Sequence, residues 1–271
     1  MNVRSPSRLH PDQCFTLVEL LVVVAVVGVL CALLLPALQS AFDQGKGAAC
    51  ISNLRQIGIA IGAYASDHDG GIPFGPKAPG FNNAGNFYPS TGAPTSLLSL
   101  QNGQPVALGL LLDPYLARTP RVLFCPGSDL VKQAQTELEK VGKKQAQGGY
   151  YYRHGGNTQL YDNPRSPFNP PSMRLATLGE NRQGKPIRAI VMDTVFFAGP
   201  ELKGFNIESY ANHRGRVAHV LYSDGHVSAL NNSDSRYTVD LRDRSNIPKA
   251  FSKILDAFEA ADQQMAGGRV P

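Results

Sequence analysis

The chain has 271 residues, four cysteines and a formal net charge of +5, from 26 Lys and Arg against 21 Asp and Glu. Its length allows one sizeable hydrophobic core, and its 27 Gly and 20 Pro predict a fold rich in loops. The basic residues are scattered in runs no longer than two. Nucleic acid is therefore not among the partners that we expect.

The first 14 residues are polar and carry Arg4 and Arg8 ahead of an apolar run. Positive charge on this flank of a membrane-spanning helix favours a cytoplasmic N-terminus. A cleavable secretory signal is the alternative, but its apolar region is usually about 7–15 residues long and this run is longer. We therefore expect the apolar segment to stay with the protein.

The apolar run extends from Leu20 to Leu38, with Glu19 at its leading edge. About 20 apolar residues span the hydrocarbon core of a bilayer, so we expect a membrane span over about residues 17–38. A carboxylate in that core costs roughly 2–3 kcal/mol, and less near the interface. Some interaction must make this cost tolerable.

Residues 15–19 read Phe-Thr-Leu-Val-Glu, and the apolar run that follows contains Pro36 near its end. This arrangement resembles the N-terminus of type IV prepilins and type II secretion pseudopilins. In that family a prepilin peptidase cuts before the phenylalanine and methylates the new amine. The resemblance implies a leader peptide over residues 1–14, a cut between Cys14 and Phe15, and N-methylation of Phe15. The family usually has glycine before the cut, where this chain has Cys14.

The same resemblance implies two roles in assembly. Glu19 would pair with the N-terminal ammonium of a neighbouring subunit, because a charge-assisted contact in a dry filament interior offsets the desolvation of the carboxylate. Pro36 removes one backbone hydrogen bond and bends or loosens the helix, which would let this region stretch during assembly. The alternative is an ordinary single-span anchor with an accidental glutamate.

Beyond Pro36, apolar residues recur at helical spacing and form one stripe. Its members are Gly47, Cys50, Leu54, Ile57, Ile61 and Tyr64. We expect one helix over residues 15–66, roughly 78 Å long at about 1.5 Å per residue. Its second half would anchor a globular domain through the stripe. Residues 50–73 also resemble a large bacterial pseudopilin-like family.

Residues 67–110 are expected to be a loop-rich region, because Gly, Pro and Asn are closely spaced there. Asp67, Asp69 and Gly70 form half of a calcium-loop pattern, without the later ligands. Some pseudopilins bind calcium in a loop, so Ca²⁺ is the one cofactor considered. A helix that ends through Asp and Gly explains the same residues, and no other metal or cofactor is expected.

Residues 111–271 are expected to form a C-terminal globular α+β domain. Cys125 ends an apolar segment that we expect to be a strand, and Cys50 lies on the inward stripe of the long helix. Outside the cytoplasm the two would meet an oxidising compartment. A Cys50–Cys125 disulfide would then contribute about 4–5 kcal/mol for so long a loop, and related sequences have cysteines at similar places. Two buried free thiols are the alternative.

Several further elements are predicted in this domain. Residues 129–148 are expected to be helical, and residues 187–196 to be an interior strand. The tail over residues 247–264 places Phe251, Ile254, Leu255 and Phe258 on one helical face, which would pack onto the sheet.

Residues 217–230 predict a β-hairpin with Asp224 and Gly225 in its turn. This piece resembles the C-terminal His…Asp-Gly signature of the same pseudopilin-like family. Here ten residues separate His213 from Asp224, one more than in that signature.

His213, His219, His226 and Asp224 are the densest group of potential metal or catalytic residues. Their spacing matches neither a zinc site nor a nucleophile beside a base. We expect structural roles instead, with Asp224 capping the turn and a histidine bracing the fold.

The sequence thus predicts an α+β, pilin-like fold in which a long, partly transmembrane N-terminal helix packs on a small antiparallel sheet domain. We expect a structural subunit of a type II secretion or type IV pilus-like filament, not an enzyme. It would cross the inner (cytoplasmic) membrane once, with its C-terminal domain periplasmic or extracytoplasmic. Its partners would be prepilin peptidase, other pilin-like subunits, the inner-membrane assembly machinery and membrane lipid.

The alternative from another class is a membrane-displayed binding module that uses this N-terminus only as an anchor. The loops of residues 67–110 and the tyrosines Tyr150–Tyr152 would then contact a ligand such as a polysaccharide.

Overall fold

The structure is a computed structural model, and it describes residues 17–75, 94–155, 173–200, 208–242 and 247–267. The expected leader peptide and the cut between Cys14 and Phe15 lie outside these residues. The chain divides into two compact units, Met1–Gln44 and Gly45–Pro271, and each is described by itself.

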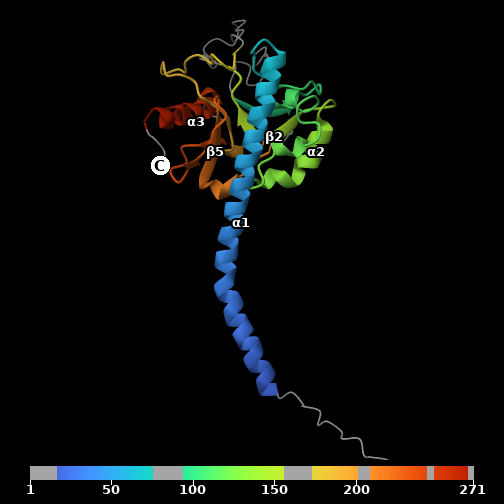
Figure 1. Cartoon of the computed structure of the whole chain (residues 1–271), viewed down its shortest axis with the longest axis vertical. Helices are drawn as coiled ribbons and strands as arrows, with labels where there is room; N and C mark the ends of the chain where they lie inside the picture. Colours follow the sequence, from blue (N-terminus) through green and yellow to red (C-terminus); the bar gives the residue numbers. More distant parts are fainter. Residues whose placement is uncertain (1–16, 76–93, 156–172, 201–207, 243–246, 268–271) are drawn as a thin grey trace, which may run out of the picture. The chain divides into compact units, whose positions relative to one another are not determined.

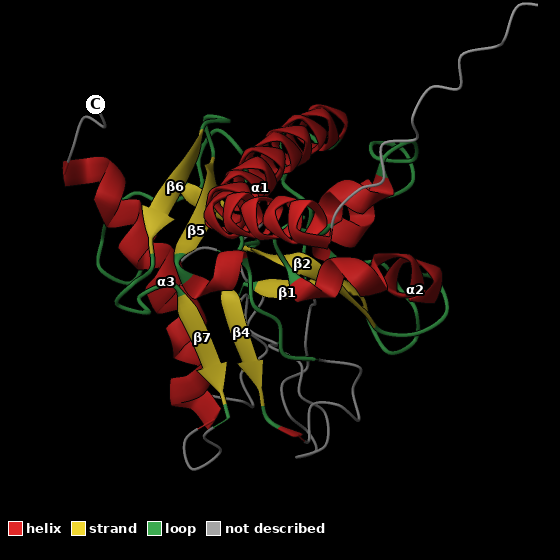
Figure 2. Ribbon diagram, turned by 90° about the horizontal axis from the view of Figure 1, so that it is seen from below, coloured by secondary structure: helices red, strands yellow, loops and turns green. Residues whose placement is uncertain are grey.

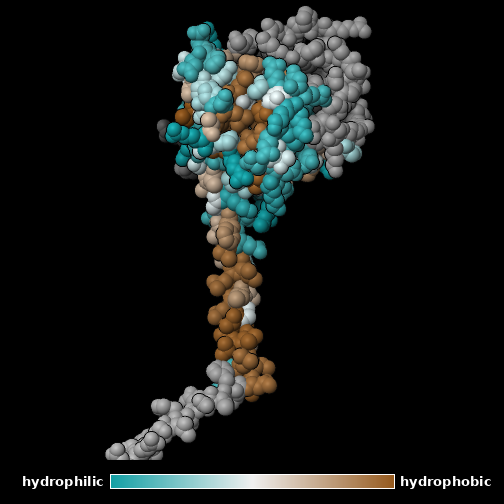
Figure 3. Space-filling model, turned by 90° about the vertical axis from the view of Figure 1, so that its right-hand side faces the viewer, coloured by the Kyte–Doolittle hydropathy of each residue, from teal (hydrophilic) through white to brown (hydrophobic). Residues whose placement is uncertain are grey.

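Helix α1 (Leu17–Asp67) is one continuous α-helix, as the sequence predicted, and it continues through Pro36 (Figure 1). In the first unit its surface is almost entirely apolar (Figure 3). The large apolar side chains from Leu17 to Leu38 are 52–78% exposed. This helix is long and apolar enough to cross a membrane.

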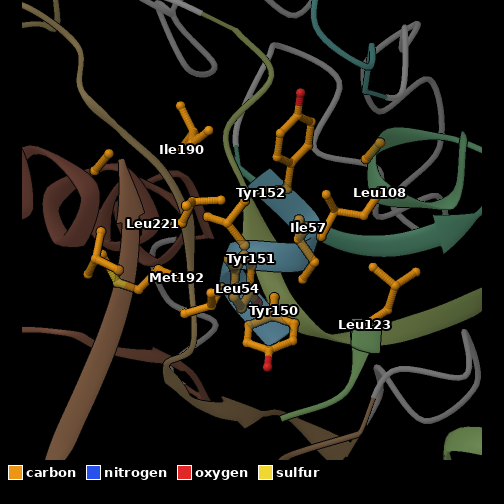
Figure 4. Packing of buried hydrophobic residues seen from close by; sticks show 14 of the residues in the cluster. Leu54, Ile57, Leu108, Leu123, Tyr150, Tyr151, Tyr152, Ile190, Met192 and Leu221 are labelled. Carbon is orange, nitrogen blue, oxygen red and sulfur yellow. The ribbon is translucent and has the colours of Figure 1, made fainter. Parts of the chain in front are cut away.

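In the second unit the same helix changes character, because one face becomes buried. The expected stripe is confirmed, with buried Cys50, Leu54, Ile57, Ala60, Ile61, Tyr64 and Ala65. Figure 4 shows two of them, Leu54 and Ile57, among core residues such as Tyr150–Tyr152 and Leu221. The helix therefore supplies one wall of the core of this unit.

The main sheet has five strands in the order β1-β2-β3-β5-β6, and all neighbours are antiparallel. This confirms the expected small antiparallel sheet, including the hairpin of β5 and β6. Its strands are β1 (Thr95–Ser99), β2 (Ala146–Tyr152), β3 (Ala189–Met192), β5 (Val217–Tyr222) and β6 (Val227–Asn231).

Two local predictions were wrong. The expected loop region contains β1 and the 3₁₀ helix η1 (Ala107–Leu111). Leu97 and Leu98 of β1 are buried in the core, and their burial stabilises this segment as a strand of the sheet. The expected strand before Cys125 is instead the 3₁₀ helix η2 (Pro120–Leu123). Proline at its first position fixes φ and has no N–H to offer a strand partner.

The expected helix over residues 129–148 is only partly correct. The 3₁₀ helix η3 (Asp129–Gln133) and helix α2 (Ala134–Lys140) occupy its first part, and β2 begins at Ala146. The buried tyrosines of β2 explain why the helix does not continue to residue 148, because aromatic residues favour a covered sheet position over a short polar helix.

The expected strand over residues 187–196 is divided at Asp193. Strand β3 ends at Met192, and β4 (Val195–Ala198) leaves the main sheet to pair in parallel with β7 (Thr238–Leu241). Asp193 therefore lies at the corner where the chain passes from one sheet to the other.

Helix α3 (Ile247–Gly267) contacts β3 and β7, as expected for the tail. Figure 2 shows α3 beside β7. Ile254, Leu255 and Phe258 are buried on the predicted face, whereas the side chain of Phe251 lies outside the described ones. The predicted packing of the tail is confirmed for the described part.

Candidate functional site

Four polar side chains from distant parts of the sequence converge inside the second unit. Cys50 comes from α1, Cys125 from the segment after η2, Asp193 from the end of β3, and His213 from the 3₁₀ turn η5 (His213–Gly215). Their candidate ligand atoms all lie within 4.8 Å of one another. We call these four residues the Cys–Asp–His cluster.

Two glycines let the backbone bring these residues together. A Cβ on Gly149 in β2 would lie 2.9 Å from the Cys125 nitrogen and 3.0 Å from Phe124 Cα. A Cβ on Gly127 would lie 2.5 Å from Cε1 of His213. Because a side chain at either position would displace Cys125 or His213, both glycines are required by close approach.

The turn that carries His213 has an unusual backbone. His213 and Arg214 have φ of 46° and 55°, in the left-handed region that costs non-glycine residues about 1–3 kcal/mol each. The His213 N–H donates to the Gly127 carbonyl at 3.1 Å, and Gly215 N–H donates to the Asn212 carbonyl at 2.8 Å. These bonds hold the strained turn with the imidazole directed at the cluster.

Asp193 is the centre of the cluster and is fully buried. Its Oδ2 accepts the thiol hydrogen of Cys50 at 2.9 Å and a hydrogen bond from His219 Nδ1 at 2.8 Å. Cys125 Sγ lies 3.6 Å and His213 Nε2 lies 3.2 Å from the same oxygen. The other carboxylate oxygen accepts the backbone N–H of His219.

Two further contacts complete the surroundings. Cys125 Sγ lies 3.1 Å from His213 Nε2, and the Tyr150 hydroxyl lies 3.4 Å from Cys50 Sγ. Burial covers all of these groups, since even the His213 side chain is only 9% exposed. The cluster is thus a closed, polar centre in the interior of the second unit.

For both Asp193 and His213, hydrogen bonds shift the pKa in the direction opposite to burial. Burial would raise the pKa of Asp193, but hydrogen bonds from His213 and His219 outweigh it and hold that pKa well below its ordinary value. Burial would lower the pKa of His213, but its bonds to Asp193 and Cys125 raise it to about 10. In the absence of a metal ion, Asp193 is therefore a carboxylate beside an imidazolium.

The two thiols differ from each other. Burial raises the pKa of Cys50 far above its ordinary value. Burial acts in the same direction on Cys125, but its interactions with Cys50 and His213 overcome it and lower its pKa. Cys125 is therefore the thiol that loses its proton more easily.

The geometry does not form a relay from nucleophile to base to acid. A base in such a relay uses one ring nitrogen for the nucleophile and the other for the acid. Here both Cys125 Sγ and Asp193 Oδ2 lie against the same atom, His213 Nε2. Both cysteines are also fully buried, so a substrate has no access to them.

The expected Cys50–Cys125 disulfide is not formed in the structure, where both residues are free thiols. The prediction brought together the right two residues, but their sulfur atoms are occupied by hydrogen bonds to Asp193 and His213. The alternative of two buried free thiols is the arrangement observed.

The other residues of the predicted hairpin group have separate roles. Asp224 accepts hydrogen bonds from the backbone N–H and Nδ1 of His226 at 3.1 and 2.6 Å, and Gly225 takes φ of 87° in the turn. Asp224 thus caps an exposed turn, while His219 braces Asp193 in the interior. Only His213 joins the Cys–Asp–His cluster.

Asp67 and Asp69 lie at the end of α1 and do not join the cluster. Asp67 Oδ2 accepts the Tyr115 hydroxyl hydrogen at 2.8 Å, and Asp69 has a left-handed φ of 52°. The Gly70 N–H donates to the Ala65 carbonyl at 2.7 Å, which closes the helix end. These contacts match the helix-end explanation of the Asp and Gly pattern.

The tyrosines Tyr150–Tyr152 were expected to be available for a ligand if the protein displays a binding module. They are instead 0–4% exposed and belong to the core. That part of the binding-module hypothesis is therefore wrong.

Sequence reasoning missed Asp193. It is the one acidic residue in the apolar segment Ile-Val-Met-Asp-Thr-Val-Phe. A buried carboxylate is costly unless it is paired, so this isolated acid was the available signal for a polar centre.

No family model, curated protein or solved structure matches the chain.

Proposed function

We propose that the chain is a prepilin-type structural subunit of the membrane. It is cut before Phe15, N-methylated there, and assembled by inner-membrane machinery into a type II secretion or type IV pilus-like filament. The observation that supports this most is the change along α1. Its apolar first half is exposed, and one face of its second half is buried in the core of the globular unit.

An exposed apolar helix needs a covering partner. Burial of one Leu or Val side chain contributes about 1.5–3 kcal/mol, and the segment from Leu17 to Leu38 exposes such side chains on all its faces. Soluble monomers rarely expose contiguous apolar surface of this extent. Lipid before assembly and neighbouring helices after assembly would cover it.

Glu19 gives this helix a feature that a plain anchor does not need. Whether the helix lies in lipid or among other helices, the carboxylate has to be placed in apolar surroundings near its N-terminal end. The amine that the cut creates on Phe15 of a neighbouring subunit supplies a charge-assisted partner. The globular unit would face the periplasm or the cell exterior.

The first experiment measures the N-terminus. The full chain is expressed in cells with and without prepilin peptidase, and its intact mass and N-terminal sequence are determined. We expect a chain that starts at methylated Phe15 only when the peptidase is present. A chain that starts at Met1 in both strains would contradict the proposal and would leave a single-span anchor.

The second experiment tests assembly through Glu19. In cells that express the filament machinery, Glu19→Ala should abolish incorporation into sheared filaments while membrane insertion persists, since an uncharged side chain only favours the lipid phase. Asp43→Ala is the matched control, because Asp43 lies on the same helix beyond the apolar run. Equal incorporation of Glu19→Ala and Asp43→Ala would contradict the assembly role.

A further inference from the structure

The Cys–Asp–His cluster combines ligand types that hydrogen bonding alone does not explain. Asp193 Oδ2 has four side-chain neighbours, Cys50, Cys125, His213 and His219, at 2.8–3.6 Å. A carboxylate oxygen has about two lone pairs to offer. More groups therefore converge on this oxygen than it can bind as an acceptor.

We propose that Cys50, Cys125, Asp193 and His213 form a binding site for one transition-metal ion of the zinc class. The ion is bound by two thiolates, one imidazole nitrogen and one carboxylate oxygen. The site lies entirely in the unit Gly45–Pro271. It is therefore independent of the membrane and filament roles proposed above.

The distances in the cluster are close to those around a tetrahedral ion. Bonds of about 2.0–2.3 Å from a tetrahedral Zn²⁺ place its ligand atoms roughly 3.3–3.8 Å apart. The pairs in the cluster are 2.9 Å for Cys50 Sγ with Asp193 Oδ2, 3.6 Å for Cys125 Sγ with Asp193 Oδ2, and 3.1 Å for Cys125 Sγ with His213 Nε2. The first and third pairs are shorter than this spacing and the second matches it, while the four candidate ligand atoms all lie within 4.8 Å of one another. Side-chain shifts of several tenths of an ångström would bring the four atoms to tetrahedral spacing.

The ligand types select the metal. Thiolate and imidazole ligands favour Zn²⁺ and other soft or borderline ions, whereas Ca²⁺ and Mg²⁺ require several oxygen ligands. The cluster offers two sulfur atoms, one nitrogen and one carboxylate group. Four protein ligands also leave no open position for a substrate, which is typical of structural zinc sites.

Metal binding changes both the protonation and the net charge of the cluster. Each thiol gives up its proton to solvent when its sulfur binds the ion, and the His213 imidazolium also releases its Nε2 proton to solvent and binds through that nitrogen. Two thiolates and one carboxylate then neutralise the dipositive ion and leave one negative charge. His219 Nδ1 lies 2.8 Å from Asp193 Oδ2 and orients the carboxylate as an outer-shell donor.

The ion would join four segments that the sequence separates widely. Cys50 and Asp193 are 143 residues apart, and Cys125 and Asp193 are 68 residues apart. Because Cys50 lies on α1, one ion fastens this helix to the sheet and to η5. This is the mechanical role that a disulfide would otherwise fill.

The test uses the full chain purified in detergent, reduced, and freed of metal with a chelator under anaerobic conditions. Titration with Co²⁺ should give thiolate-to-cobalt charge-transfer absorption and tetrahedral d–d bands that saturate at one ion per chain. Binding of either ion to the metal-free protein should release at least the two thiol protons and raise the Tm, and Zn²⁺ should displace the cobalt. Wild-type protein suffices for this part, so misfolded variants cannot obscure it.

Substitutions then assign the ligands. Cys50→Ser, Cys125→Ser and His213→Asn should remove the charge-transfer absorption or weaken Zn²⁺ binding more than His219→Asn, for which a loss of about 10–100-fold is typical of an outer-shell partner. Cys31→Ser and His226→Asn are the matched controls, because Cys31 lies in the apolar half of α1 and His226 at an exposed turn. Both controls should bind as the wild type does.

Three results would overturn the proposal. The first is reduced wild-type protein without thiolate-to-cobalt absorption. The second is an equal loss of binding in Cys31→Ser, which would place the metal elsewhere. The third is protein isolated from cells with a Cys50–Cys125 disulfide and no bound metal. None of these results bears on cleavage at Phe15 or on Glu19, so the two proposals succeed or fail separately.

Discussion

At the scale of single residues, Arg153 and Asp262 form a fully buried ion pair outside the Cys–Asp–His cluster. Arg153 Nη1 lies 2.8 Å from Asp262 Oδ2, and both side chains are 0% exposed. Asp262 also accepts hydrogen bonds from the backbone N–H groups of Arg188 and Ala189 at 2.9 Å each. The carboxylate thus ties α3 to the end of β2 and the start of β3.

Loss of this carboxylate should be costly, because it leaves the Arg153 charge buried without its partner. We expect Asp262→Ala to lower the free energy of unfolding by about 3–5 kcal/mol. Asp256→Ala on the same helix is the control, since Asp256 pairs with Arg182 but its side chain is 59% exposed. Such exposed pairs contribute only about 0–1 kcal/mol.

The measurement is urea unfolding of the full chain in detergent, followed by tyrosine fluorescence for the two variants and the wild type. Similar midpoints for Asp262→Ala and Asp256→Ala would show that the buried pair is not required for stability.

At the scale of elements, α1 serves two environments along one helix. Its first part is apolar on all faces, and its second part is apolar on one face only. A helix that is apolar all round belongs in lipid or in a buried bundle, whereas one with a single stripe packs on a domain. The change of pattern therefore marks where one environment gives way to the other.

Two isoleucines on this helix test the stripe. Ile57 is 0% exposed and Ile59 is 74% exposed. We expect Ile57→Ala to lower the free energy of unfolding by about 2–5 kcal/mol, because it leaves a cavity in the core. Ile59→Ala should change it by less than about 0.5 kcal/mol.

The same unfolding experiment compares these variants, which have identical chemistry and differ only in burial. A comparable loss in both would mean that Ile59 is covered by a partner in the purified protein, and the assignment of the exposed face would have to be revised.

At the scale of the whole molecule, the two units should differ in what surrounds them in the cell. Cys31 is an exposed thiol in the apolar part of α1. If lipid or other helices cover this part, Cys31 is shielded in the cell although nothing in its own unit buries it. The globular unit has its own core and would be surrounded by water.

Thiol labelling measures this difference. In cells with a permeabilised outer membrane, a membrane-impermeant maleimide should leave Cys31 unlabelled until detergent is added. The variant Ser233→Cys places a thiol at an exposed position of the globular unit and should be labelled at once. Immediate labelling of Cys31 would contradict a membrane-embedded helix, and failure to label Ser233→Cys would contradict an extracytoplasmic globular unit.

The amino-acid sequence by itself determined the features that depend on local periodicity. An apolar run long enough for a bilayer and a stripe at helical spacing predicted α1 over nearly its observed length. Alternating residues and an Asp-Gly turn predicted the β5–β6 hairpin. These signals lie within short windows of the chain, so no knowledge of distant contacts was needed.

Tertiary structure alone decided the elements whose residues have no strong local pattern. The short β1 became a strand because the core draws Leu97 and Leu98 inward, and β3 separates from β4 at Asp193 because β4 pairs with a strand far along the chain. Likewise the sequence predicted that Cys50 lies near Cys125, but it did not predict that Asp193 and His213 lie beside them. These four residues come from separate segments of the chain. Convergence of such segments is set by how the sheet, α1 and η5 pack, and no spacing along the chain encodes it.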